Sequence, residues 1–325
     1  MSRNRCIRIV QAVLLTIVCT VTTAAQSQRQ ATLLKQRSFR HSVPAGNYSG
    51  VTYLGGNRYA VCNDKSATAG FHLFTIDIDS LTGRILHVSH DDFRSAGGDN
   101  RDEEGIAYFV PDGTLFVSGE SDGEVVEYAM SGEPTGRRLS VPRELVSRAL
   151  PNRSLEALSY NFSTASFWTC TESPLSDETA LRLMRFDNTL HAGGQWLYGM
   201  DQPVAARRKG RSVHGVAALS ALDDGRLLVL EREVFAARRG IGSFVHCCIY
   251  SVLPTEANAG QLLDKQLLAE FTTRINLVRR SLANYEGMCV GPRLADGRRV
   301  LVMVCDSQNQ YRGLLRDWFK TIVLD

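Results

Sequence analysis

Three stretches of the chain place a glutamate directly before a small residue and an apolar run. They read DEEGIAYF at 102–109, SLEALSYN at 154–161 and NYEGMCVG at 284–291. The glutamates are Glu104, Glu156 and Glu286, and each stands at the start of a run that predicts a buried strand. A buried carboxylate is costly unless it is hydrogen-bonded, paired or bound to a cation. The repetition therefore marks candidate ligand positions.

A second acid follows each of these glutamates at a similar distance along the chain. The pairs are Glu104 with Glu120 and Glu156 with Glu172, each 16 residues apart, and Glu286 with Asp306, 20 residues apart. The pattern recurs twice more, with Ser49 and Asp64 and with His214 and Glu231. In an antiparallel hairpin the start of the first strand and the end of the second lie at the same edge. We therefore expect all of these side chains at one end of the fold.

Calcium is the cation that such a set of carboxylates favours, because it takes roughly 6 to 8 oxygen ligands in flexible geometry. Magnesium fits poorly with so many carboxylates, and zinc lacks the cluster of Cys and His ligands that it prefers. The predicted metal ligands are Asp64, Glu104, Glu120, Glu156, Glu172, Glu231, Glu286 and Asp306. The alternative for each acid is to cap a turn or to pair with an arginine.

Two other side chains in these stretches are candidates for catalysis. Arg232 follows Glu231 in LLVLERE, and its planar guanidinium matches the oxygens of a phosphate. An ion pair with one of the acids is the alternative role. His214 stands where other copies carry an acid, so it is a candidate for proton transfer or substrate binding. Its alternative is a hydrogen-bonded structural histidine.

The elements that carry these residues form a repeat. Five copies of the pattern place a small residue at Gly50, Gly105, Ala157, Gly215 and Gly287, at spacings of 55, 52, 58 and 72 residues. Each copy continues as short apolar strands separated by turn residues such as those at 111–113. Serial four-stranded antiparallel units are the blades of a β-propeller. The sequence therefore predicts an all-β propeller of five blades, and the long last spacing leaves a sixth open.

The last unit lacks a fourth strand, and the N-terminal region contains a match for it. The segment KTIVLD at 320–325 forms a third strand, whereas KQRSFRHSVP at 35–44 resembles the fourth strand GRRLSVP at 136–142. We expect the N-terminal segment to supply the missing strand and close the ring, because closure removes exposed sheet edges.

Residues 1–25 have the pattern of an export signal. Three arginines precede the apolar run 9–21, and Thr23-Ala24-Ala25 forms a small-residue cleavage site. Residues 26–325 are then predicted to form a single propeller domain, exported to the periplasm or secreted as a monomer. No later segment has the ~20 unbroken apolar residues that a membrane span needs, so we expect none.

The charged residues and cysteines exclude some classes of partner. The formal net charge is only +3, and the basic clusters at 207–209 and 238–239 are short. We interpret these clusters as solvated loops and expect no nucleic-acid partner, because nucleic-acid surfaces show a concentrated basic face. Six cysteines follow the predicted signal. Disulfides are permitted, and the spacing selects no connectivity.

Several stretches between about residues 100 and 310 resemble the phytase-like family, described as having esterase-like activity and related in architecture to calcium-dependent β-propeller alkaline phytases. They are EEGIAY, PNRSLEALS, RLMRFD, DGRLLVLERE and NYEGMCVGPRLADGRRVLVMVCDSQ. The family's last motif usually reads Asp-Asp-Asn or similar, whereas this chain has Asp306-Ser307-Gln308. At that motif the resemblance is carried over to Asp306 alone. It implies a propeller and suggests hydrolysis of a phosphate ester.

The sequence thus predicts an exported calcium-dependent hydrolase of a small-molecule phosphate ester, with its site in the central channel of the propeller. One alternative is a carboxylic-ester or lactone hydrolase that uses the same site. No Gly-x-Ser-x-Gly nucleophile elbow supports a serine esterase. The other alternative is a non-catalytic propeller that binds a protein or a glycan.

Overall fold

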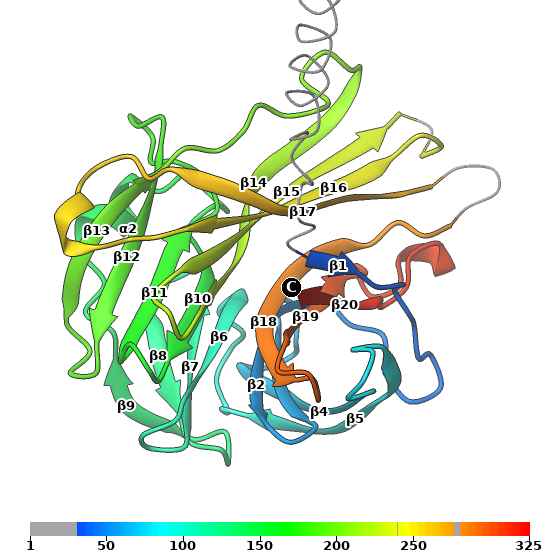
Figure 1. The fold of residues 1–325 in the computed structure, drawn as a ribbon, viewed down its shortest axis with the longest axis horizontal. Helices are drawn as coiled ribbons and strands as arrows, with labels where there is room; N and C mark the ends of the chain where they lie inside the picture. The colour runs from blue at the N-terminus through cyan, green and yellow to red at the C-terminus, as the bar shows by residue number, and fades with distance from the viewer. Residues whose placement is uncertain (1–30, 239, 276–279) are drawn as a thin grey trace, which may run out of the picture. The chain divides into compact units, whose positions relative to one another are not determined.

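Five four-stranded antiparallel sheets make up residues 31–325, which form one compact unit of a computed structural model (Figure 1). The structure describes residues 31–238, 240–275 and 280–325. The predicted export signal, residues 1–25, lies outside the described residues. Each sheet is a blade whose strands follow one another along the chain, except in the fifth. The described part of the chain confirms the predicted five-bladed propeller.

The strands of the five blades are as follows. Blade one contains β2 (Tyr48–Gly55), β3 (Arg58–Asn63), β4 (Gly70–Ile78) and β5 (Ile85–Ser95), and blade two contains β6 (Glu103–Phe109), β7 (Thr114–Gly119), β8 (Val125–Tyr128) and β9 (Pro134–Arg138). Blade three contains β10 (Leu155–Asn161), β11 (Ser166–Thr171), β12 (Leu181–Asp187) and β13 (Ala192–Tyr198). Blade four contains β14 (Gly210–Ala221), β15 (Leu227–Ala237), β16 (Phe244–Val252) and β17 (Lys265–Arg274). Blade five contains β18 (Asn284–Arg293), β19 (Arg299–Asp306), β20 (Phe319–Leu324) and β1 (Ala31–Leu33).

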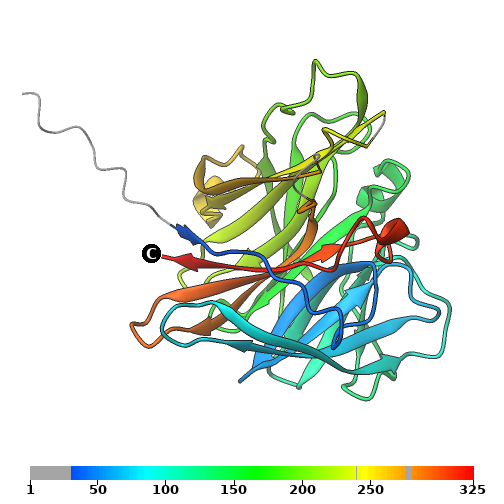
Figure 2. The same cartoon turned by 90° about the vertical axis from the view of Figure 1, so that its right-hand side faces the viewer.

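The N-terminal strand closes the ring, as predicted, but with different residues. β1 pairs antiparallel with β20, and Ala31 lies opposite Leu324 (Figure 2). The predicted segment 35–44 follows this strand and adds only an isolated bridge between Arg37 and Phe319. The residues that supply the fourth strand therefore precede the stretch that resembles other fourth strands. Residues 254–284, where a sixth blade was left open, instead contribute β17 to blade four.

The recurrent small residues of the repeat allow the innermost strands to approach one another closely. A Cβ atom on Gly50 would lie 2.4 Å from the carbonyl oxygen of Glu104 in the next blade. A Cβ on Gly287 would lie at the same distance from the carbonyl oxygen of Ser49. Real side chains cannot occupy such space, so glycine is required where backbone packs on backbone. The five first strands β2, β6, β10, β14 and β18 thereby enclose a narrow channel.

Apolar side chains from adjacent blades fill the space between the sheets. Leu230 of β15 shares a core cluster with Met303 of β19 and Ile322 of β20. Between blades two and three, the rings of Phe116 and Phe167 pack with centroids 4.7 Å apart. Burial of one such side chain contributes about 1.5–3 kcal/mol. The six cysteines of the described region are all free and buried, so their role there is packing.

Helical structure is confined to short connections. The helix α2 (Arg143–Arg148) lies between blades two and three, and the 3-10 turns η1 (Glu256–Asn258) and η2 (Tyr311–Gly313) lie within blades four and five. Among the residues that the structure describes, no helix combines the length and the apolar character needed to cross a membrane.

Blade four is longer than the others at one end. Its strands β14 and β15 have 12 and 11 residues, whereas β10 and β11 of blade three have 7 and 6. Figure 1 shows β14, β15 and β16 reaching beyond the ring at the upper end. This extension changes which residues of blade four face the channel.

Candidate functional site

A β-bulge places the first glutamate of blades two, three and five at the channel. The register of the first hairpin shifts between Glu103 and Ile106, between Leu155 and Ala157, and between Tyr285 and Gly287. A bulge redirects a side chain out of the alternating pattern of the strand. Glu104, Glu156 and Glu286 therefore line the cavity between the five first strands. Its volume of about 10 Å³ is close to the space of one water molecule.

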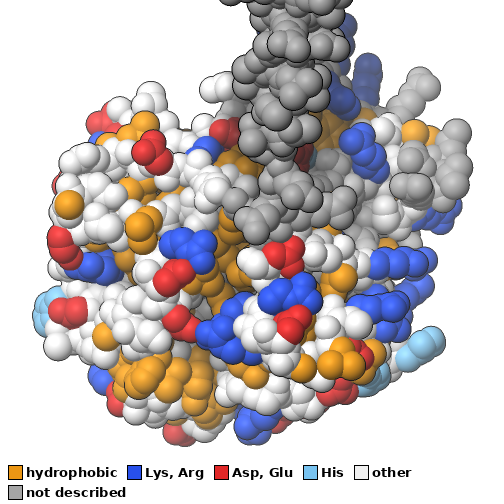
Figure 3. Space-filling model, in the orientation of Figure 1, with side chains coloured by type: hydrophobic (Ala, Val, Ile, Leu, Met, Phe, Trp, Pro, Cys, Tyr) orange, Lys and Arg blue, Asp and Glu red, His pale blue; other side chains and the backbone are white. Residues whose placement is uncertain are grey.

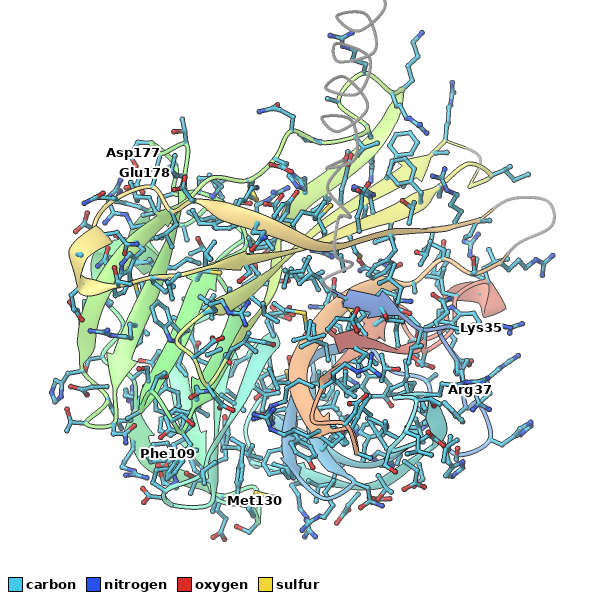
Figure 4. All side chains as sticks on the ribbon, viewed as in Figure 1. Lys35, Arg37, Phe109, Met130, Asp177 and Glu178 are labelled. Atoms are coloured by element: carbon cyan, nitrogen blue, oxygen red, sulfur yellow. The ribbon has the colours of Figure 1, made fainter. Side chains whose placement is uncertain are left out.

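The second acid of each pair follows the second strand at the same end of the ring. Asp64, Glu120 and Glu172 follow β3, β7 and β11 directly, and Asp306 is the last residue of β19. Figure 4 shows the two ends of the blades: Asp177 and Glu178, in the β11–β12 connection, lie at the upper end, and Phe109 lies at the lower end. The structure thus brings both sets of acids to one end of the propeller.

In blade four the equivalent positions are Ala217 and Arg232, which corrects the predicted alignment. The bulge of β14 lies between Val216 and Ala218, three residues beyond the predicted position. Val216 pairs with Glu231 as Tyr285 pairs with Cys305 in blade five. Arg232 consequently occupies the place of Asp306. Blade four contributes no acid at these two positions and instead supplies a cation.

Arg232 is buried and bridges acids from the two neighbouring blades. Its Nη2 atom donates to Glu172 Oε1 at 2.7 Å, and its Nη1 atom donates to Glu286 Oε1 at 2.5 Å and to Asn284 Oδ1 at 3.0 Å. Glu156 Oε1 lies 3.9 Å from Nη2. Burial acts to lower the pKa of Arg232, and these glutamates outweigh it and raise the pKa. The guanidinium is therefore a fixed positive charge among three glutamates.

The three first-strand glutamates have strongly raised pKa values. Burial is the largest cause for Glu104, and the nearby carboxylates of Glu156 and Glu286 raise its pKa further. The pKa values of Glu156 and Glu286 are also raised mainly by burial, although Arg232 opposes the shift at both. No described side chain or backbone N–H donates a hydrogen bond to the Glu104 carboxylate. Its charge is therefore left uncompensated.

Two aspartates from adjacent blades adjoin the glutamates. Burial raises the pKa of Asp306 to about 6, partly offset by the hydrogen bond from the Gln308 N–H, and nearby Asp64 raises it further. Burial also raises the pKa of Asp64 despite Lys65, whose Nζ lies 3.3 Å from Asp64 Oδ2. The other oxygen of Asp64, Oδ1, is buried and has no hydrogen-bond partner among the described residues.

Glu231 and His214 lie apart from this cluster, in a network between blades three and four. Glu231 accepts hydrogen bonds at 2.6 Å from Tyr198 and from Lys265, and at 3.0 Å from the N–H of Asp201. His214 Nε2 lies 3.5 Å from Glu231 Oε2. Burial acts to raise the pKa of Glu231, but the hydrogen bonds from His214, Lys265 and Tyr198 outweigh it and lower the pKa. This carboxylate is fully paired within the protein.

The donor set of the acidic cluster suits calcium. Its side chains offer carboxylate oxygens, and the partnerless Oδ1 of Asp64 is an acceptor that a hard cation would satisfy. Within residues 31–238, 240–275 and 280–325, no three Asp, Glu, His or Cys side chains stand close enough together to share one ion. Binding a cation therefore requires the carboxylates to move closer to one another.

These features define a five-bladed β-propeller with a carboxylate cluster at one end of its channel. The chain belongs to the phytase-like family, described as "Esterase-like activity of phytase", whose sequence model matches residues 43–308. This match confirms the family indicated by the sequence motifs. No curated protein sequence matches the chain.

Several solved structures resemble the chain at low sequence identity. An endo-arabinase from Bacteroides thetaiotaomicron VPI-5482 is 10% identical with a TM-score of 0.47, over 87% of this chain and 95% of that chain. The RS223-Beta-xylosidase is 9% identical with a TM-score of 0.45, over 88% and 94%. A streptogramin B lyase is 12% identical with a TM-score of 0.42, over 90% and 98%. Likeness at this level says nothing of function.

Sequence reasoning missed three residues that hold the cluster in place. Asn284 donates to Glu286 at 2.8 Å and accepts from Arg232. Arg153 Nε lies 3.9 Å from Glu172 Oε2, and the backbone N–H of Ser154 donates to Glu120 at 3.1 Å. All three stand within the stretches NYEGMCVG and PNRSLEALS, so the signal was their place two or three residues before a site glutamate.

Proposed function

We propose that the protein is a calcium-dependent hydrolase of a phosphate ester, with its site at the acidic end of the propeller. The observation that carries the proposal is the convergence of carboxylates from four blades at one end of the channel, where a buried arginine pairs with those of blades three and five. The phytase-like family to which the chain belongs supports a hydrolase. The pattern of residues 1–25 supports export.

Asp64, Glu104, Glu120, Glu156, Glu172, Glu286 and Asp306 are the proposed ligands. When bound, calcium supplies a Lewis acid that polarises a phosphoryl oxygen and lowers the pKa of water. Arg232 neutralises part of the cluster and positions Glu172 and Glu286 through its two Nη groups. Direct contact of Arg232 with phosphate stays a prediction. Both of its Nη groups already pair with carboxylates. Glu231, which is fully paired, is left out of the ligand set.

A carboxylic-ester or lactone substrate is the second candidate, and the family's description supports it because it names an esterase-like activity. The same carboxylates and cation would then polarise a carbonyl rather than a phosphoryl group. A non-catalytic propeller that binds a protein or glycan is the third. The sequence motifs do not separate these three.

A single set of measurements separates the candidates. Chelator-treated protein is titrated with calcium by calorimetry, and its hydrolysis of p-nitrophenyl phosphate and p-nitrophenyl acetate is measured with calcium and with chelator. We expect calcium binding and calcium-dependent cleavage of the phosphate ester. The absence of binding heat at millimolar calcium would exclude calcium as a ligand of this protein. Cleavage of the acetate alone would favour the carboxylic-ester candidate, and cleavage of neither would favour the binding protein.

A further inference from the structure

The basic cluster at 207–209 and Arg238 come together on the projecting end of blade four. We call this part the arm: residues 207–213 and 235–238, residues 240–244, and residues 274, 275 and 280. β14 and β15 run alongside one another there, so that Arg211 lies opposite Ala236. Phe244 at the start of β16 pairs with Arg274 at the end of β17. The isolated bridge between Ile275 and Arg280 adds the last segment.

Seven basic side chains of the arm are exposed. They are Arg207, Arg208, Lys209, Arg211, Arg238, Arg274 and Arg280. Arg208 and Arg274 flank the same ring, with their Cζ atoms 5.1 and 5.9 Å from the centroid of Phe244. Seven cations exceed the formal net charge of +3, so the rest of the chain is net negative. The arm therefore carries a local excess of positive charge.

None of these seven side chains forms an ion pair with a described residue. The residues outside the described ranges contain no Asp or Glu that could pair with them. Several arginines elsewhere are paired: Arg137 contacts Asp112 and Glu127, and Arg298 contacts Asp296 and Asp325. Figure 3 likewise shows acidic and basic side chains interspersed over the lower part of the face it presents. The arm thus carries positive charge that the chain itself does not neutralise.

Apolar side chains accompany the cations. Ile241, between Gly240 and Gly242 in the β15–β16 turn, is 56% exposed, and Val213 is 38% exposed. A projecting element with basic residues around exposed apolar ones matches a surface of anionic lipids, which attracts the charges and admits the apolar side chains. Nucleic acid fits less well, because the aromatic rings of the arm, Phe235 and Phe244, are buried and offer no face for base stacking.

We propose that the arm is a docking site for an anionic phospholipid surface. The arginines contact lipid phosphates through their planar guanidinium groups, and Ile241 enters the boundary between headgroups and acyl chains. The interaction is reversible and weakened by salt, because exposed charges are screened.

Vesicle sedimentation with the full chain tests the proposal. The vesicles contain phosphatidylcholine alone or with one quarter phosphatidylglycerol, and binding to the first reports any contact that does not depend on lipid charge. The arm variant is R207Q/K209Q/R211Q/R238Q, which spares Arg208 and Arg274 because they stack on Phe244. The control variant is K35Q/R40Q/R58Q/R84Q, which removes four exposed cations outside the arm. Melting temperatures establish that both variants are folded.

We expect the wild type and the control variant to bind the anionic vesicles and to be released by 0.5 M salt. The arm variant should bind at least tenfold more weakly, and Ile241→Ser should weaken binding several-fold with all charges retained. Equal losses of vesicle binding in the arm and control variants would overturn the proposal. A wild type that does not bind the anionic vesicles would overturn it as well. Saturable binding of inorganic phosphate would assign the arm to a free anion, and binding of an oligonucleotide without vesicle binding would assign it to nucleic acid.

Discussion

Glu104 of blade two and Glu231 of blade four belong to the same propeller and experience opposite environments. Glu231 accepts hydrogen bonds from a tyrosine, a lysine and a backbone N–H, and these lower its pKa although burial acts to raise it. Glu104 has no donor among the described residues, and burial together with its acidic neighbours raises its pKa. The fold thus stabilises the buried carboxylate of Glu231 and destabilises the half-buried carboxylate of Glu104.

This difference separates structural acids from candidate ligand acids better than burial does. A carboxylate such as that of Glu231, whose two oxygens both accept hydrogen bonds within the fold, contributes to folding and has no free oxygen for a ligand. A cluster that is only partly paired costs stability until a cation neutralises it. Such a cost is typical of functional sites, where pKa values are perturbed by burial and by like charges. Each of the predictions below removes one buried or half-buried charge and tests whether the fold compensates that charge.

The largest effect is expected from Glu104→Gln, which removes one negative charge from the cluster and keeps the size of the side chain. Calcium-dependent phosphoesterase activity should fall tenfold or more, because metal activation lowers the barrier by several kcal/mol. The melting temperature in chelator should hold or rise, because repulsion is relieved. Glu133→Gln, at an exposed position of blade two, is the matched control and should keep full activity. A folded Glu104→Gln protein with full activity would exclude this residue as a ligand.

The second effect is expected from Glu231→Gln, which should lower stability and leave calcium binding unchanged. Neutralising this acid leaves Lys265 with a single carboxylate partner, Asp201. Breaking a buried pair of this kind costs about 3 kcal/mol, measured as a lower free energy of unfolding in urea. Calcium affinity should be unchanged in the folded variant. A loss of calcium binding without a loss of stability would place Glu231 among the ligands and break the comparison.

The fold could be predicted from the sequence because each residue type that recurs in the repeat has a local structural reason. The glycines at 50, 105 and 287 are required where backbones of adjacent blades touch. Glycines such as Gly113, with φ of 67°, form the turns that connect the strands of a hairpin. These constraints act within a few residues or recur at every blade. They therefore remain visible in a single sequence.

The structure places the predicted acids of blades one, two, three and five at one end of the channel, whereas in blade four it places Ala217 and Arg232 at the positions predicted for His214 and Glu231. Gly215 fits the repeat pattern, but in the longer strand of this blade it lies before the bulge, and Ala217 takes the channel position. The pairing of Arg232 with Glu172 and Glu286 joins three blades. Contacts of this kind depend on the angular arrangement of the sheets, which no local pattern specifies.

Stability without metal should fall as pH rises, which is the third effect in size. The pKa of Asp306 is raised to about 6 from 3.8, so the folded protein holds this proton more tightly than the unfolded chain does. Stability is then full below about pH 4 and is lost as pH rises through 6, by about 3 kcal/mol for this group. Urea unfolding of the chelator-treated protein at pH 4 to 7 measures the loss.

Asp306→Asn should flatten that profile by the same amount, and calcium should abolish the loss in the wild type. The raised pKa values of Glu104, Glu156 and Glu286 add to the fall in the same direction. A chelator-treated protein that gains stability between pH 4 and 7 would show that the cluster is compensated within the fold.

The smallest effect is expected at Lys320, a buried cation without a carboxylate partner among the described residues. Its Nζ donates to the carbonyl of Leu34 and lies 4.9 Å from the ring centroid of Phe271. Burial lowers its pKa to about 8 from 10.5, and the nearby Cys247 opposes the shift. The unfolded chain therefore holds this proton more tightly, and the free energy of unfolding should rise by about 1 kcal/mol between pH 7 and 9. Lys320→Met, which keeps the volume without the charge, should be more stable than the wild type at pH 7, with a difference that shrinks by that amount at pH 9. Parallel urea-unfolding profiles for the two proteins would mean that Lys320 keeps its ordinary pKa, and that an unpaired buried charge in this propeller need not weaken the fold.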